Sequence, residues 1–175
     1  MATMGAADTA VRSPRDYLRI YLSDHHAACR ATVALGRRVL KSNEGSALGT
    51  YLADRLVPDL ERDLSDLENV MRRLGFGPQR WKDAAATAAE RVGRLKPNGQ
   101  IRGYSPLSRV LELEGLELAI TGTRAMWKTL SDVAPRDPRL VDVDFDGLIR
   151  RADEHCGELR KHHEVAVRTA FPQPA

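Results

Sequence analysis

The stretch LERDLSDLENVMRRLG, residues 60–75, decides the fold of this chain. Apolar residues recur in it every three or four positions and charged residues fill the positions between them, which is the pattern of a helix with one buried face. The same stripe continues back to residue 52, and Gly75 marks its end. Pro58 lies inside this helix, where it removes one backbone hydrogen bond, so the sequence predicts a kink there.

Three other stretches repeat this period, and the sequence therefore predicts four long helices and no strand. Their starts are marked by residues that cap helices: Ser13-Pro14 for the first, Ser105-Pro106 for the third, and Asp142 or Asp144 for the fourth. They are expected to end at residues 43–45, near residue 133 and before Pro172. The predicted fold class is all-α.

The composition sets the scale of the molecule. The chain has 175 residues, of which 42% are apolar, 29% charged and 5% aromatic, a balance that favours one helical domain with its own core. No apolar run reaches the ~18–20 residues of a membrane span, and residues 1–13 lack the pattern of a secretory leader. We expect a cytoplasmic globular protein with a flexible N-terminus at 1–13, one domain at 14–171 and a tail at 172–175.

The connections between the helices predict their order in space. Two are short, whereas residues 76–105 form one long link between the second and third helices. This is the connectivity of a ferritin-like four-helix bundle, and a short extra helix is predicted in the crossover at Trp81–Leu95. The direction of the crossover stays open at this point, because the link can either cross the length of the bundle or return to the same end.

The third helix is apolar on two sides. One side carries Leu113, Leu116, Ile120, Trp127 and Leu130, and the other carries Leu107, Val110, Leu111, Leu118 and Ala125. A helix with two apolar sides is buried on both, so we expect the 76–105 segment or a second subunit to cover the second side.

Charge and cysteine content narrow the function classes. The 27 basic and 24 acidic residues alternate along helical faces rather than gathering into a stripe, so nucleic-acid binding is not the leading expectation. A weak association with nucleic acid through Arg91, Arg94 and Arg102 stays open.

Cys29 and Cys156 are far apart, form no CxxC motif and fall on apolar stripes, which predicts buried free thiols. The motifs of phosphate-binding loops, zinc proteases and serine hydrolases are missing from the sequence.

Several ionisable residues point towards the predicted core. They are His25, Asp63, Glu114, His155 and His163, with Asp59 at the edge of its stripe. His25 and Asp63 lie equally far from the turn between the first two helices, and Glu114 and His163 equally far from the last turn. We therefore expect each pair to be level across a helix hairpin. If the crossover spans the bundle, His155 joins the first pair; otherwise four of these residues converge.

Two interpretations of these residues remain. Burying an unpaired charge is costly, so the first is a hydrogen-bonded network that fixes the register of the helices. The second is a metal site for iron or manganese, because imidazole and carboxylate groups at one level can serve as ligands. No cofactor is expected under the first interpretation.

Two stretches also resemble a known group of proteins. LERDLSDLENVMRRLG (60–75) and VGRLKPNGQIRGYSPLSRVLELEGLELAI (92–120) resemble helical proteins of high-GC bacteria, and the first is similar to the YciF branch of the ferritin-like proteins. The resemblance covers about residues 14–171 and implies a dimeric ferritin-like bundle with no settled activity. The iron-binding pattern requires Glu-x-x-His motifs, whereas the fourth helix carries His155-x-x-Glu158, the reverse order. Only Glu114 stands where a third-helix ligand is expected.

These observations predict a protein without catalytic activity that acts through oligomerisation or a protein partner, most simply as a homodimer. The alternative is an atypical metal-binding ferritin-like protein with storage or redox activity. Its ligands would be His25, Asp63 and Glu114 together with His155 or His163.

Overall fold

A computed structural model describes residues 12–77 and 104–173, and every regular element in these ranges is helical. The prediction of an all-α protein with four long helices is confirmed. The elements are α1 (Pro14–Ser42), α2 (Ala47–Tyr51), the π-helical turn η1 (Leu52–Leu56), α3 (Val57–Arg73), α5 (Pro106–Val133), two short 3₁₀ turns, η2 (Ala134–Arg136) and η3 (Pro138–Leu140), and α6 (Phe145–Ala170).

Local side chains fix the helix starts, as predicted. Ser13 caps α1: its hydroxyl oxygen accepts a hydrogen bond from the backbone N–H of Asp16 at 3.2 Å, and the Asp16 carboxylate accepts one from the Ser13 backbone N–H. Ser105 caps α5 in the same manner, and of the two candidate caps for α6 the structure selects Asp144. Each cap satisfies a backbone N–H that has no partner within its helix.

The kink expected at Pro58 takes the form of a π-helical turn. The N–H of Val57 bonds to the carbonyl of Leu52, five residues earlier, so the helix widens by one residue just before the proline. The wider turn accommodates a proline ring that would clash with a carbonyl of a regular α-helix. As a result α2, η1 and α3 form one continuous rod, which ends at Gly75 with a φ of 76°.

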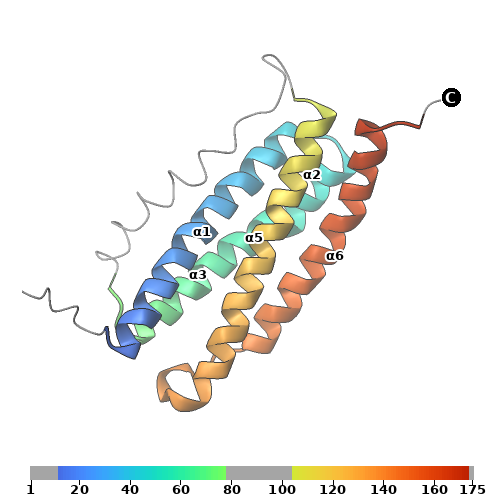
Figure 1. Ribbon diagram of the computed structural model, residues 1–175. Helices are drawn as coiled ribbons and strands as arrows, with labels where there is room; N and C mark the ends of the chain where they lie inside the picture. The colour runs from blue at the N-terminus through green and yellow to red at the C-terminus, as the bar shows by residue number, and fades with distance from the viewer. Residues whose placement is uncertain (1–11, 78–103, 174–175) are drawn as a thin grey trace, which may run out of the picture.

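The described ends of the link between α3 and α5 lie at opposite ends of the bundle. At one end Asn43 Nδ2 donates to the Tyr104 hydroxyl at 3.0 Å, which places the start of α5 beside the end of α1. At the other end an Arg139 guanidinium N–H donates to the carbonyl of Leu74, just beyond α3, at 3.2 Å. Helices α3 and α5 are therefore parallel, while α1 and α6 run the opposite way (Figure 1). The predicted helix at Trp81–Leu95 lies outside the described residues, as do positions 1–11 and 174–175.

The four long helices pack around a continuous apolar core. One cluster of buried residues surrounds Trp127 and Leu67, and a second surrounds Leu116 and Leu52. The backbones approach closely along α1–α3, α1–α5 and α5–α6, but not along α3–α6. No helix in the described ranges is long and apolar enough to cross a membrane.

The second apolar side of α5 is only partly buried. Val110 is 5% exposed and belongs to the core, whereas Leu107, Leu111 and Leu118 are 38%, 41% and 76% exposed. Residues 78–103 of the segment expected to cover this side lie outside the described residues. Among the described residues, this side of α5 faces outward.

Candidate functional site

A group of ionisable residues lies in the interior where α3 faces α6. Asp59, Asp63 and Asp66 are spaced at i, i+4 and i+7 and so share one face of α3, and Arg151 and His155 share one face of α6. Together with Tyr51 of α2 these residues form what we call the polar seam. Asp63 and His155 are its buried members, at 5% and 4% exposure.

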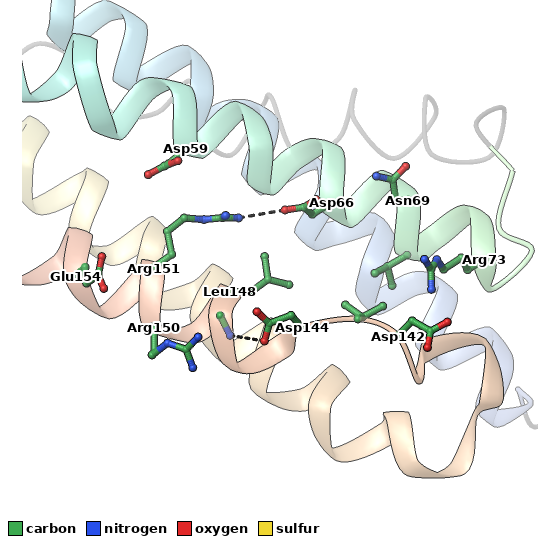
Figure 2. A pocket seen from close by; sticks show the side chains of 13 residues that line it. Asp59, Asp66, Asn69, Arg73, Asp142, Asp144, Leu148, Arg150, Arg151 and Glu154 are labelled. Atoms are coloured by element: carbon green, nitrogen blue, oxygen red, sulfur yellow. Dashed lines mark hydrogen bonds and ion pairs between the residues drawn. The ribbon is translucent and has the colours of Figure 1, made fainter.

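Arg151 joins the two helices through an ion pair. Its Nε donates to Asp63 Oδ1 at 3.1 Å, and its Nη2 donates to the same oxygen. The Nη2 also donates to Asp66 Oδ2 at 3.1 Å, the contact drawn in Figure 2. Burial raises the pKa of Asp63 to about 6, against the opposing effect of the Arg151 charge and hydrogen bonds. The guanidinium therefore offsets only part of the cost of burying this carboxylate.

His155 is the centre of a second chain of hydrogen bonds. Its Nε2 lies 2.9 Å from Asp59 Oδ2, and its Nδ1 lies 2.8 Å from the Tyr51 hydroxyl. Burial lowers the pKa of His155 and raises that of Tyr51, so the neutral forms of both side chains are favoured. In the arrangement consistent with these charges, Tyr51 donates to Nδ1 and Nε2–H donates to the carboxylate of Asp59.

A cleft of about 540 Å³ lies beside the polar seam, between α3 and the first turns of α6. Carboxylates and guanidiniums both line it, over a floor that includes Leu148. Arg151 extends across this region to Asp66 (Figure 2). Asp59, two turns before Asp66 on α3, and Glu154, one turn after Arg151 on α6, also line the cleft. The cleft therefore mixes both signs of charge.

The predicted pairing of His25 with Asp63 is wrong. His25 is half-buried with its ring edge against Tyr21, at a centroid distance of 4.5 Å, and Asp63 bonds to Arg151 instead. The neighbouring His26 makes the α1–α3 contact, with Nε2 3.0 Å from Glu68 Oε1. His25 is thus level with the part of α3 near Glu68. The π-helical turn adds one residue to the rod and so accounts for part of the difference from the register counted outward from the turn.

The predicted pairing of Glu114 with His163 is confirmed, with 3.1 Å between Glu114 Oε1 and His163 Nε2. This pair lies on the surface, however, since the two side chains are 53% and 29% exposed. It joins α5 to α6 and takes no part in the polar seam. Within the described ranges the structure brings together no group of three or more His, Cys, Asp and Glu residues suited to hold a metal ion.

Sequence reasoning missed Arg151 and Tyr51. An arginine on the shoulder of an apolar stripe is usually solvated, but its long stem lets the guanidinium reach into a neighbouring helix. The available signal was the spacing: Arg151 lies one turn before His155, which the sequence pattern does place near the core.

Both cysteines are buried and free, as predicted. Burial raises the pKa of Cys29 to about 11, which makes its thiol unreactive.

No protein-family model, curated protein or solved structure matches this chain.

The raised pKa of Asp63 predicts a pH-dependent effect of its substitution. The Asp63 carboxyl has a pKa near 3.8 in the unfolded chain, so the folded protein binds its proton more tightly than the unfolded chain does. Protonation of Asp63 therefore stabilises the folded protein, and this contribution is complete below about pH 4. That stability is lost as the pH rises through about 6, and the difference between the two pKa values corresponds to about 3 kcal/mol. Asp63→Asn cannot titrate, so we expect its free energy of unfolding, relative to wild type, to rise by about 3 kcal/mol between about pH 4 and pH 7.

Urea denaturation at a series of pH values measures this difference. The opposite pH dependence of His155 is present in both proteins and cancels. Asp132→Asn, which removes an exposed carboxylate paired with Lys128, is the control for the substitution itself. A difference between Asp63→Asn and wild type that stays constant with pH would contradict the assignment.

Proposed function

We propose that this chain is a non-catalytic helical bundle that acts by pairing with a second copy of itself through the outer face of α5. One set of exposed positions carries the proposal. We call it the outer stripe: Leu107, Leu111, Glu114, Leu118, Thr121 and Ala125.

The outer stripe has the spacing of a coiled-coil seam. Its members alternate at intervals of four and three residues over nearly three heptads, and every one of them is exposed in the single chain. Leu118, at 76% exposure in the middle of the helix, gains nothing from the fold of its own chain. Covering such a row of leucines removes apolar surface from water, and a twofold axis lets one stripe serve both partners.

The polar seam supports a structural role for the interior. Both ring nitrogens of His155 and the guanidinium of Arg151 are held by side chains of the same protein. A side chain engaged in this way fixes the register of the helices. The alternative of an iron or manganese site formed by His25, Asp63, Glu114, His155 and His163 has less support, because His25 and the Glu114–His163 pair lie apart from Asp63 and His155 in the polar seam.

The order of the helices supports a ferritin-like assignment. One crossover that runs the length of the bundle, with parallel α3 and α5, is the connectivity of ferritin-like folds. We infer that the chain is a bundle of this kind in which the metal ligands have been replaced by hydrogen-bonded and ion-paired side chains.

Leu118→Asp tests the proposal. A carboxylate in the centre of an apolar interface would be buried without a partner, so the variant should sediment as a single chain under conditions where wild type sediments as a dimer. Its helix content should match wild type, since the side chain is exposed in the single chain. Sedimentation velocity together with far-UV circular dichroism measures both properties.

Val165→Asp is the matched control. Val165 is also an exposed aliphatic residue, at 53%, but it lies on α6 two positions beyond His163 and so points away from α5. This variant should remain a dimer. A dimer that survives Leu118→Asp, or one that Val165→Asp disrupts equally, would mean that another surface joins the chains.

A further inference from the structure

The α3–α6 edge differs from the other three edges of the bundle. Along α1–α3, α1–α5 and α5–α6 the helix backbones pack closely, whereas α3 and α6 are further apart. Glycine contributes to the close approach along α1–α3, where a Cβ added to Gly36 would lie only 3.1 Å from Leu60 Cδ1. The bundle therefore consists of two hairpins, α1–α3 and α5–α6, joined firmly along α1–α5.

Side chains rather than close backbones bridge the remaining edge. Arg151 bonds to Asp63 and Asp66, and His155 bonds to Asp59. The cleft of about 540 Å³ adjoins these contacts, and Asp59, Asp66 and Arg151 line it directly. Low local packing density and an adjoining cleft are the features of an edge that opens more readily than the whole protein unfolds.

We propose that the two hairpins swing apart along the α3–α6 edge while α1–α5 stays packed as the hinge, and that Arg151 is the latch that holds this edge closed. Opening enlarges the cleft and brings Asp63 and His155, which are buried in the closed form, into contact with solvent. This motion is independent of the pairing proposed for α5.

Arg151 is suited to this role by its reach and by its partners. Its side chain is 20% exposed, so its outer part borders the cleft while its guanidinium contacts a carboxylate whose side chain is 8% exposed. Hydrogen bonds to charged groups are among the stronger contacts in a protein, and three of them converge on one residue here. A single substitution can therefore shift the equilibrium between the closed and open forms.

Distances between pairs of spin labels on the full-length chain test the proposal. Labels at Ser65→Cys and Glu154→Cys span the α3–α6 edge, and labels at Arg30→Cys and Lys128→Cys, outside the outer stripe, report on α1 and α5. Both native cysteines are replaced by alanine. All four labelled positions are exposed, so the labels do not enter the core.

Arg151→Met, which keeps the apolar stem, should increase the long-distance population of the first pair about tenfold and leave the second pair unchanged. Arg150→Met is the control, since Arg150 lines the same cleft without a described ion pair, and it should leave both pairs unchanged. A single short distance for the first pair in every variant overturns the proposal. Equal broadening of both pairs overturns it as well, because that result means general loosening rather than motion about a hinge.

Discussion

Trp127→Ala should lower the free energy of unfolding by about 3–5 kcal/mol, the largest stability effect expected in this protein. Trp127 is fully buried on α5 and belongs to the core cluster at the end of the bundle where α5 turns into α6. Its ring lies 6.3 Å from that of Phe145, the first residue of α6, so the loss also loosens the turn between these helices. Urea denaturation followed by circular dichroism measures the change without relying on the fluorescence of the missing indole.

Trp127→Phe is the informative companion variant. The indole Nε1 is buried and has no hydrogen-bond partner among the described residues, so phenylalanine removes an unsatisfied donor as well as part of the ring. We expect a loss of less than about 2 kcal/mol. If phenylalanine were as costly as alanine, the indole nitrogen would have to be making a contact that matters for stability.

Arg151→Met should lower the free energy of unfolding by about 2–3 kcal/mol at pH 7, the second large effect. Breaking a buried ion pair commonly costs about 3–5 kcal/mol because one charge is left without a partner. The loss is smaller here because Asp63, with a pKa of about 6 in the intact protein, can take up a proton once the guanidinium is gone. For the same reason the loss should shrink at about pH 5, which urea denaturation at the two pH values would show.

The double variant Asp63→Leu, Arg151→Met separates the pair from its parts. Replacing both charges by apolar side chains removes the cost of burying the carboxylate, so the double variant should be more stable than Arg151→Met alone and close to wild type. A double variant that loses the sum of the two single losses would show that the two residues contribute independently and that the ion pair is not the feature that matters.

The helix boundaries could be predicted because their causes are local. Ser13, Ser105 and Asp144 accept hydrogen bonds from backbone groups three residues away, and Gly75 adopts the positive φ that ends the rod. Each cap and the backbone N–H group that it satisfies lie within one helical turn of each other in the sequence. The π-helical turn was harder to anticipate, since Pro58 shows that the helix must deviate but not how it deviates.

The contacts between helices were predicted less well because they depend on register. Glu114 and His163 meet as expected because α5 ends at Val133 and α6 begins after its cap Asp144, the two boundaries from which the pairing was counted. His25 and Asp63 do not meet, since His26 lies level with Glu68 and the extra residue of the π-helical turn contributes to this shift. The interior role of Arg151 required knowing how far apart α3 and α6 lie, a distance that no residue pattern encodes.

Pairing of α5 with a second copy of the chain doubles the mass of the particle in solution. We would measure the mass of the untagged 175-residue protein by light scattering after size exclusion, over a hundredfold range of concentration. We expect twice the chain mass, falling towards one chain only at the lowest concentrations. A single chain throughout, with the leucines of the outer stripe still exposed, would contradict it.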